Sequence, residues 1–421
     1  MNRMLQEYGD EVLFASFRQQ IMTFLKELFP CGLWDRVWLV GGGVRDLLLG
    51  RSIRDIDLLA AVSPAVLDSL GFRLVLGKST PPVYFRSDPV WGGIELVRLT
   101  GSGDLLADLG RRDFTANALA LSLAGEFVDP FGGSRDVRRR ILRACSRKTF
   151  HDDPLRIFRA FRFEAEGWRL AAKTEAVILE NSWDESLAGI PAERFSREMM
   201  RALAGAEPER FFIRMLESRT GFSYLPELPL MKTIPAGPPN GHPEGDLLAH
   251  SLQVLKEVAA RSGDPLARFC AFFHDLGKLI TSPSLYPHHR DHGEAGFMFA
   301  ADLCDRLRLP GRYRSALMWV SRLHGRVNCW QNLGDPFKLQ TVRQAQRAGI
   351  ADVLPMIAGA DSSGGRDVRG WDCAVQVVNL SCRELGITPE IMVNTAVAQR
   401  ADVILQARVK LYRELISAGS P

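Results

Sequence analysis

The spacing of hydrophobic residues along the chain changes near residue 150. Before it, from residue 37 to about 145, short apolar runs are separated by Gly, Pro and Asp, as is typical of strands. The predicted strands are RVWLVGG, DIDLLA, RLVLG, VYFRS, GGIELVRL and EFVDPF. After residue 150, apolar residues recur every three or four positions, which predicts helices almost throughout. A helix over FRQQIMTFLKELF precedes the sheet region, so the pattern predicts an α+β fold with a small mixed sheet.

Length and composition narrow the class of protein. The 421 residues exceed one ordinary core, which predicts about two to four domains. A net charge of +4 permits a nucleic-acid partner only where Arg clusters locally. Seven scattered cysteines without CxxC spacing predict reduced thiols and a cytoplasmic location. No apolar run is long enough to cross a membrane, and MNRMLQEYGDEVLF lacks the apolar region of a signal peptide, so no membrane partner is expected.

The stretch LVGGGVRDLLLGRSIRDIDLL, residues 39–59, carries the first candidate chemistry. Its glycines let the backbone approach a phosphate, and the amides that follow can donate to phosphate oxygens. Asp55 and Asp57 are separated by one residue on a predicted strand, so their side chains point to the same face. Two such carboxylates beside a phosphate-binding turn predict a Mg²⁺ and nucleotide site.

Two further segments extend this site. Glu95, in the predicted strand IELVR, would complete a carboxylate cluster for two Mg²⁺ ions, unless it is an ordinary edge residue. Such ions activate a 3′-hydroxyl and stabilise charge on the α-phosphate and the leaving pyrophosphate. RRDFTANAL, residues 111–119, supplies paired arginines that can bind phosphate oxygens, and Asn117, which can contact a ribose hydroxyl or cap a turn.

The segment HDDPLR predicts a helix start, because an acidic residue precedes a proline at the first helical position. Asp153 and Arg156 then lie three apart on one helix face. A carboxylate beside a guanidinium can pair with the Watson–Crick edge of a base, and a surface ion pair is the alternative. Arg159 and Arg162 continue this face and predict a stripe that faces phosphates.

Together these motifs resemble those of the class II tRNA nucleotidyltransferases of the DNA polymerase β superfamily, which include CCA-adding enzymes and bacterial poly(A) polymerases. The matching segments, in the family's order, are GGGVRDLLLG (41–50), RDID (54–57), RRDFTANAL (111–119), DDPLRIFRAFRF (152–163) and PAERFSRE (191–198). The resemblance implies an enzyme that adds nucleotides from CTP and ATP to the 3′ end of tRNA by two-Mg²⁺ transfer, releasing pyrophosphate. It also implies a polymerase β-like head, followed by all-helical neck, body and tail regions.

The site residues that follow from the motifs and the resemblance fall into three groups. The catalytic carboxylates and Mg²⁺ ligands are Asp55 and Asp57, with Glu95 as the third acidic residue. The residues implied to hold triphosphate and ribose are Gly42, Gly43, Arg45, Arg111, Asp113 and Asn117. The residues implied to act as an amino-acid template for CTP or ATP are Asp153 and Arg156, with Arg159 as a further nucleotide-binding residue. The family's usual Glu-Asp pair before this helix is Asp152-Asp153 here.

Seven of the eight histidines lie between His242 and His324. Imidazoles and an aspartate from several predicted helices indicate a second site, for a transition-metal ion, formed by His250, His274, Asp275, His292 and His324. This set resembles the HD-type phosphohydrolase domain that some bacterial CCA-adding enzymes carry, which implies hydrolysis of phosphoesters such as 2′,3′-cyclic phosphates. An acidic residue would be expected after His324, where the chain has Gly325, so Asp361 is the alternative last ligand. An inactive domain that keeps only its structure is the competing interpretation.

The predicted domains are a catalytic head over 1–148, a neck that selects nucleotides and binds RNA over 149–232, an HD-type domain over 233–330 and a helical tail over 331–421. The segment 225–246 is rich in Pro and Gly and predicts a linker or domain boundary.

The connection between the Glu95 strand and RRD is short. Only LTGSGDLLADLG, residues 99–110, intervenes, and its second half resembles the family's approach to RRD. In CCA-adding members a longer loop here helps the pocket switch from CTP to ATP. The shortening predicts an enzyme that adds two cytidines and leaves the adenosine to a separate A-adding enzyme.

Two alternative functions remain at this point. A bacterial poly(A) polymerase would carry a basic segment where this chain has LGKSTPPVYF, residues 76–85. A metal-dependent phosphohydrolase whose N-terminal half only binds RNA would not need Asp55, Asp57, Arg111 and Arg156, all of which are present.

Overall fold

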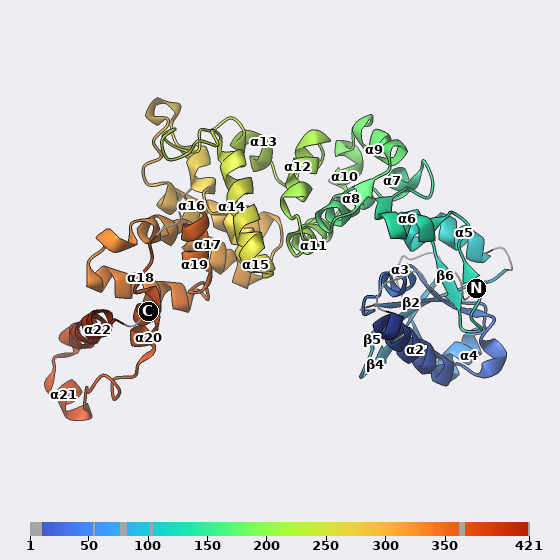
Figure 1. Cartoon of the computed structure of the whole chain (residues 1–421), viewed down its shortest axis with the longest axis horizontal. Coiled ribbons are helices and arrows are strands. Elements are labelled where there is room, and N and C mark those ends of the chain that lie inside the picture. The colour runs from blue at the N-terminus through green and yellow to red at the C-terminus, as the bar shows by residue number, and fades with distance from the viewer. Residues whose placement is uncertain (1–10, 54, 76–81, 102–103, 362–366, 420–421) are drawn as a thin grey trace. The chain divides into compact units, whose positions relative to one another are not determined.

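The computed structural model describes residues 11–53, 55–75, 82–101, 104–361 and 367–419, with side chains described from residue 19. Arg54 of the RDID motif, residues 76–81 and residues 102–103 of the short connection lie outside the described residues. The chain divides into two compact units, Met1–Ser182 and Trp183–Pro421 (Figure 1). The finer division into four domains stays a prediction.

A mixed sheet forms the centre of the N-terminal unit. Its strand order is β3-β4-β5-β2-β1-β6-β7, and β2 pairs with β5 in parallel while the other pairs are antiparallel. The strands are β1 (Val37–Val40), β2 (Ile56–Ala60), β3 (Arg73–Leu74), β4 (Val83–Asp88), β5 (Gly92–Arg98), β6 (Ala120–Ser122) and β7 (Phe127–Val128). All six predicted strands are therefore present. The sequence analysis missed β6, because ALS follows directly on the RRD motif and is too short to show alternation.

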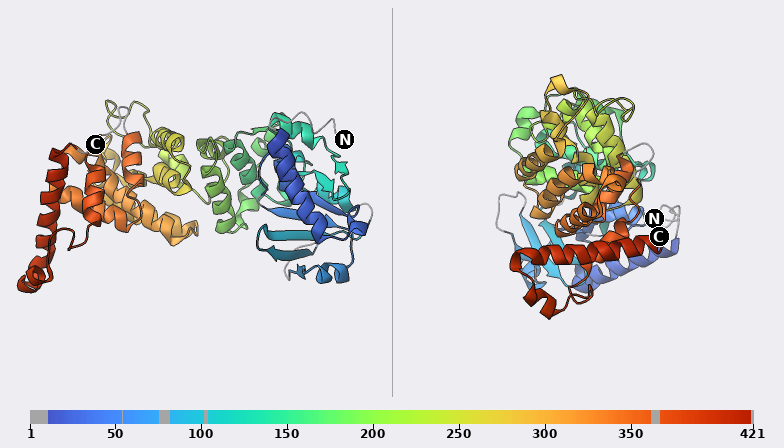
Figure 2. Two further views of the ribbon diagram at one scale, coloured as in Figure 1. Left: turned by 60° about the horizontal axis from the view of Figure 1, so that its bottom comes forward. Right: turned by 90° about the vertical axis from the view of Figure 1, so that its left-hand side faces the viewer.

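The long N-terminal helix packs on this sheet (Figure 2). Ile21, Leu25 and Phe29 of this segment are buried, as the predicted lead-in helix requires. The helices are α2 (Glu11–Leu28), α3 (Gly42–Leu48), α4 (Pro64–Ser69), α5 (Asp104–Gly110), α6 (Gly133–Arg139), α7 (Thr149–Asp152), α8 (Leu155–Ala165) and α9 (Ala172–Leu179), with 3₁₀ turns η1 (Cys31–Leu33) and η2 (Thr115–Asn117). A two-stranded parallel ladder, β8 (Ile141–Leu142) with β9 (Arg169–Leu170), completes the unit.

The described part of the C-terminal unit is helical, as predicted. Its first helices are α10 (Asp184–Ala188), α11 (Ala192–Leu203), α12 (Glu209–Glu217), α13 (Glu227–Met231), α14 (Leu247–Arg261) and α15 (Pro265–Phe273). The later ones are α16 (His292–Arg306), α17 (Gly311–Asn328), α18 (Asp335–Arg347), α19 (Val353–Ala360), α20 (Trp371–Asn379), α21 (Pro389–Asn394) and α22 (Arg400–Ser417). The 3₁₀ turns are η3 (Leu276–Ile280), η4 (Pro283–Leu285), η5 (Trp330–Asn332) and η6 (Val397–Gln399). Apolar helix faces at three- and four-residue spacing form its core.

The prediction of a linker over residues 225–246 is wrong. Leu228, Met231 and Ala236 in this segment are fully buried, and Leu247 N donates to Ile234 O at 2.8 Å. The boundary between the two compact units follows Ser182 instead. The Pro and Gly content reflects the tight path of a packed segment, which composition alone does not distinguish from a linker.

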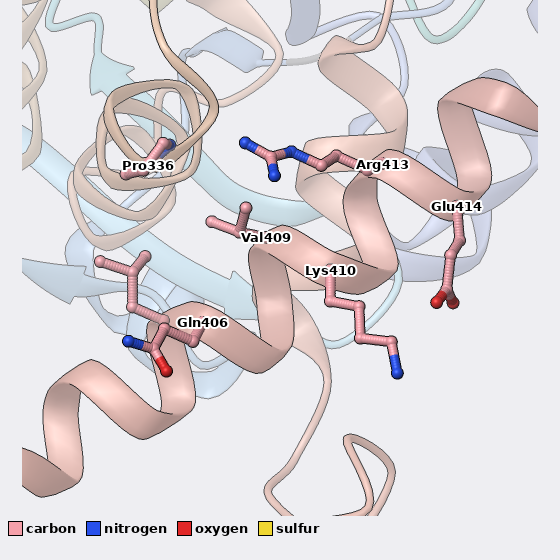
Figure 3. Close-up of a pocket in the computed structure, with 7 residues that line it drawn as sticks. Pro336, Gln406, Val409, Lys410, Arg413 and Glu414 are labelled. Carbon is pink, nitrogen blue, oxygen red and sulfur yellow. The ribbon is translucent and has the colours of Figure 1, made fainter.

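The C-terminal helix borders a shallow hollow. Its lining comes from α22 and the start of α18, namely Pro336, Leu405, Gln406, Val409, Lys410, Arg413 and Glu414 (Figure 3). None of these residues belongs to a predicted site. Among the described helices, none combines the length and apolar character needed to cross a bilayer.

Candidate active sites

Two carboxylates from adjacent strands lie opposite each other on the sheet. Asp57 in β2 pairs in register with Glu95 in the parallel strand β5, so both side chains project from one face. Asp55 immediately precedes β2, in a bend, and its charge acts on Asp57. Burial raises the pKa of Asp57, Arg112 lowers it, and Glu95 and Asp55 raise it, leaving it above its ordinary value. The three predicted carboxylates thus form one cluster of negative charge that a cation would relieve.

The glycine run brings an arginine to this cluster. Gly41 has a φ of +67°, and a Cβ there would lie 2.4 Å from Nη1 of Arg112 and 3.7 Å from Oδ2 of Asp57. Only a glycine permits this backbone and this close approach. The sequence analysis gave Arg111 a site role, whereas the structure places Arg112 beside Asp57. Asp108 holds Arg112 through bonds of 3.2 and 3.1 Å, and Arg111 lies outward with 62% of its side chain exposed.

Behind the cluster, three predicted site residues bind one another. Asn117 accepts a hydrogen bond from Arg45 Nη1 at 2.7 Å and donates to Asp113 Oδ1 at 2.9 Å. Asp113 is buried and pairs with Arg159 at 2.9 Å. Burial raises the pKa of Asp113, but Arg159 and two hydrogen bonds hold it below its ordinary value. In this structure Asp113 and Asn117 therefore orient Arg45 and Arg159, and their direct contact with triphosphate or ribose stays a prediction.

The predicted base-selecting pair lies where α7 ends and α8 begins. Asp153 Oδ1 accepts from Leu155 N at 3.2 Å, but the N-cap of α8 is Pro154, so the predicted helix start with Pro154 as its first residue is displaced by one position. The Arg156 guanidinium donates to Arg111 O at 2.8 Å and to Thr149 O at 3.2 Å. Two carbonyls thus hold the plane of this guanidinium in one orientation, as a group that reads a base edge requires.

The predicted stripe of phosphate-facing arginines is wrong for Arg162. This residue is buried, pairs with Glu166 and lies with its guanidinium 4.1 Å from the centre of the Phe163 ring. Arg159 is held by Asp113, as described above. Three residues fall short of a full helical turn, so each i, i+3 step rotates by about 60° around the helix, and Arg162 lies on the side of α8 that faces the core.

The connection between β5 and RRD is as short as predicted. Helix α5 begins at Asp104, and the Asp104 carboxylate accepts hydrogen bonds from Thr100 N at 2.7 Å and Gly101 N at 2.6 Å. These bonds clamp the end of β5 to the start of the helix. The described part of the connection therefore offers no room for a long loop.

A second cluster lies in the C-terminal unit. His250 Nε2 is 2.8 Å from Asp361 Oδ1, and His274 Nε2 is 3.4 Å from both Asp361 Oδ1 and Asp275 Oδ2. All four residues are buried, and one donor atom of each lies within 4.8 Å of the others. The structure thus brings Asp361, the alternative last ligand, into the cluster in place of an acidic residue at position 325.

The two remaining histidines of the predicted second site approach the other oxygen of the same aspartate. His292 Nε2 and His324 Nε2 lie 3.3 and 3.2 Å from Asp275 Oδ1, and 3.0 Å from each other. The predicted ligands therefore divide into two groups that share Asp275. Lys278, which the sequence analysis did not select, donates to Asp275 Oδ2 at 2.6 Å and to Ala236 O at 2.7 Å.

The outer nitrogens of these rings are anchored. Nδ1 of His274 contacts Ala271 O at 2.9 Å, Nδ1 of His292 contacts His289 O at 2.7 Å, and Nδ1 of His324 contacts Ser321 O at 2.8 Å. A carbonyl partner requires the proton on Nδ1, which leaves Nε2 unprotonated and directed inward in a neutral ring. This is the arrangement of metal-ligating histidines.

His250 differs because its Nδ1 contacts a carboxylate. Glu244 Oε1 lies 2.7 Å from His250 Nδ1 and 2.9 Å from His242 Nδ1. The sequence analysis passed over Glu244 because it lies in the Pro- and Gly-rich segment. The signal available was its place six residues before His250, on the turn that enters α14.

The donor set suits a divalent cation. Burial alone would lower the pKa of His274, but Asp275 and Asp361 raise it to about 10. Protons therefore neutralise the buried carboxylates where a cation could do so. Imidazole and carboxylate ligands suit first-row transition ions. Gly277 allows η3 to approach α16, since a Cβ there would lie 1.9 Å from His292 O.

Comparison with known proteins agrees with this geometry. Residues 37–74 and 85–143 match the poly A polymerase head domain. The chain is 35% identical over 323 residues to a multifunctional CCA protein of Shewanella denitrificans, covering 72% of this chain and 76% of that protein. A multifunctional CCA protein of Nitrosococcus oceani is 37% identical over 316 residues, covering 70% and 76%.

Solved structures share the fold. The Bacillus stearothermophilus CCA-adding enzyme in complex with CTP has a TM-score of 0.61 and 24% identity, covering 97% of this chain and 98% of that one. The Thermotoga maritima CCA-adding enzyme complexed with tRNA has a TM-score of 0.61 and 18% identity, covering 100% and 98%. The predicted order of a sheet-containing head followed by helical regions is confirmed.

Proposed function

The chain belongs to the family of nucleotidyltransferases that contains the multifunctional CCA proteins, and on this basis we propose that it adds cytidine from CTP to the 3′ end of tRNA. The observation that carries the proposal is the register of Asp57 with Glu95, with the charge of Asp55 close enough to act on Asp57. Asp57 and Glu95 on adjacent strands, Asp55 just before β2 and the nearby Arg112 would form a site for a metal-bound triphosphate.

The site residues would have separate roles in nucleotidyl transfer. Asp55, Asp57 and Glu95 would hold Mg²⁺, which stabilises the charge that develops on the α-phosphate and the leaving pyrophosphate. Arg112 and Arg45 supply positive charge near the triphosphate, and Asn117 fixes the orientation of Arg45.

A tRNA that ends at the nucleotide before CCA tests the proposal. Incubation with Mg²⁺ and CTP alone should lengthen this RNA, and incubation with UTP or GTP should not. Product length on a sequencing gel measures the result. An RNA that stays unchanged with every nucleotide and every divalent ion would refute the proposed function.

We assign the choice of base to Asp153 and Arg156. Replacing Arg156 by lysine keeps the charge but removes the planar fork that is held by Arg111 O and Thr149 O. The ratio of kcat/KM for CTP to that for UTP should fall by about 10- to 100-fold, the loss of one good bidentate contact. Single-turnover addition with each nucleotide measures this ratio. Arg169→Lys, at an exposed arginine of the same unit, should leave the ratio unchanged.

We further propose that addition stops after two cytidines. The support is the short connection from β5 to α5, where the Asp104 carboxylate accepts hydrogen bonds from Thr100 N and Gly101 N. A pocket that must enlarge for adenine needs a movable neighbouring segment, and these bonds hold the described residues Thr100 and Gly101 at the start of α5. A separate A-adding enzyme would then complete the end from ATP.

A second candidate function is metal-dependent hydrolysis of phosphoesters in the C-terminal unit. It is favoured by the inward Nε2 atoms around Asp275 and by the burial of His250, His274, Asp275 and Asp361. A transition ion there would activate water for attack on phosphorus. Substrates such as 2′,3′-cyclic phosphates occur at damaged RNA ends, which suits a partner that is itself RNA.

The proposed setting of both activities is the cytoplasm. All seven cysteines are free, as expected of a reducing compartment. The head, neck, HD-type and tail regions over 1–148, 149–232, 233–330 and 331–421 are proposed as functional divisions, and the neck range crosses the boundary between the two compact units after Ser182.

A further inference from the structure

Four residues form a straight row across the sheet of the N-terminal unit. Asp57 is opposite Glu95, Glu95 is opposite Phe85, and Phe85 is opposite Arg73. Residues directly opposite each other project from the same face, so this strand row leads from the catalytic carboxylates to the sheet edge. We call Asp57, Glu95, Phe85 and Arg73 the strand row.

The strand row lies on the open part of its face. Phe85 is 41% exposed, whereas its neighbours on the opposite face, Tyr84 and Ile94, are buried. Two residues further along β5, Val97 packs against an apolar cluster that includes Leu109 of α5. The covering of this face therefore ends just before Glu95, and an aromatic ring is left beside the carboxylates.

The ring of Phe85 rests on bare backbone. A Cβ at Gly93 would lie 2.9 Å from Cε2 and 3.3 Å from Cζ of Phe85, so the ring occupies the space above this glycine. Gly93 therefore lies against the ring, and 41% of Phe85 remains exposed to solvent. An exposed aromatic surface of this kind is what nucleic-acid-binding proteins use to stack a base.

Arg73 adds a positive charge at the end of the row. Its side chain is 74% exposed and lies 3.6 Å from Asp68 Oδ1. An exposed pair at this distance contributes little and exchanges readily for a stronger partner. A phosphate offers Arg a bidentate contact, and the backbone of RNA presents one for every nucleotide.

We propose that the strand row binds the terminal nucleoside of the RNA that is being extended. Its 3′-hydroxyl lies at Glu95, its base stacks on Phe85, and its 5′-phosphate contacts Arg73. Adjacent strands are about 4.8 Å apart, so Phe85 and Arg73 lie about 5 and 10 Å along the row from Glu95, a span that one nucleotide covers. The inference rests on the proposed nucleotidyl transfer and assigns the acceptor side of that site; Phe85 is a positioning residue.

A substitution that keeps packing but removes stacking tests the role of Phe85. Phe85→Leu still covers Gly93, and it should raise the KM for tRNA on the order of tenfold while the KM for CTP stays unchanged. Phe85→Tyr should restore the wild-type KM. Val90→Ala, at an exposed apolar residue of the same hairpin that lies off the row, serves as control.

A change in the acceptor RNA distinguishes the loss of base stacking from general damage to the variant protein. An acceptor whose last nucleoside lacks its base, but keeps ribose and 3′-hydroxyl, should be extended less well by the wild type. Phe85→Leu should not raise the KM for this abasic RNA further, because the stacking contact between base and ring is already absent. Arg73→Gln should raise the KM on both RNAs and flatten its dependence on salt.

Different outcomes would contradict the strand row and the proposed function. An equal loss for Phe85→Leu on intact and abasic RNA, or an unchanged KM for tRNA, would overturn the strand row as the acceptor site. Failure of the wild type to extend intact tRNA would instead overturn the proposed function from which the inference starts.

Discussion

Replacing Asp57 by asparagine should lower the rate of CTP addition to tRNA on the order of 10³-fold. Asp57 is the most enclosed carboxylate of its cluster, shares its face with Glu95 and lies within electrostatic reach of Asp55. Loss of one carboxylate weakens the binding of a Lewis-acid cation. Such a cation stabilises the transition state by several kcal/mol, and each 1.36 kcal/mol corresponds to a factor of ten in rate. Single-turnover kinetics at saturating CTP and Mg²⁺ measure the effect.

Two controls make the Asp57→Asn result specific. Asp35→Asn removes an exposed aspartate of the same unit and should leave the rate unchanged. Thermal unfolding of Asp57→Asn should match or exceed that of the wild type, because a buried and mutually repelling carboxylate is removed. Unchanged addition by a folded Asp57→Asn protein would show that transfer does not use this cluster.

His274→Ala should abolish metal-dependent hydrolysis of a 2′,3′-cyclic nucleotide without stopping CTP addition. His274 is fully buried and lies 3.4 Å from both Asp275 and Asp361. Removal of even an outer partner of a metal ligand commonly costs 10- to 100-fold, so loss of the ligand itself should cost at least about 100-fold. Formation of the 2′- or 3′-nucleoside monophosphate with Ni²⁺, Co²⁺, Mn²⁺ or Zn²⁺ measures hydrolysis on the same preparations used for CTP addition.

The matched control is His288→Ala, at an exposed histidine outside the cluster, which should keep both activities. If the wild-type protein fails to hydrolyse the cyclic nucleotide with any of these four ions, the proposed hydrolase activity is refuted. Loss of both activities in His274→Ala would identify the cluster as a structural support for the chain.

Much of the N-terminal site could be predicted because its parts are local. The glycine run, Asp55 and Asp57 fall within 21 residues, and period-two alternation settles their common face. The position of Glu95 required only that its own strand, β5, lie beside β2, as it does. Arg112 could not be chosen over Arg111, because the choice depends on how closely a side chain can pass Gly41.

The second cluster could be predicted only in part from the spacing of residues along the sequence. His250, His274 and His324 could be selected by residue type, but their division into two groups around Asp275 depends on the packing of helices far apart in the sequence. Glu244 was missed because Pro and Gly were taken as signs of a linker. Arg162 was placed outward because helical spacing gives a face but not the depth at which that face is buried.

The central claim is that this site adds cytidines to tRNA and then stops, and product sequencing tests it most directly. A tRNA that ends before CCA is incubated with Mg²⁺, CTP and ATP together, and the 3′ ends are sequenced over time. We predict ends that reach CC and gain adenosine only after an A-adding enzyme is supplied. Rapid conversion to CCA by this chain alone would contradict the claim.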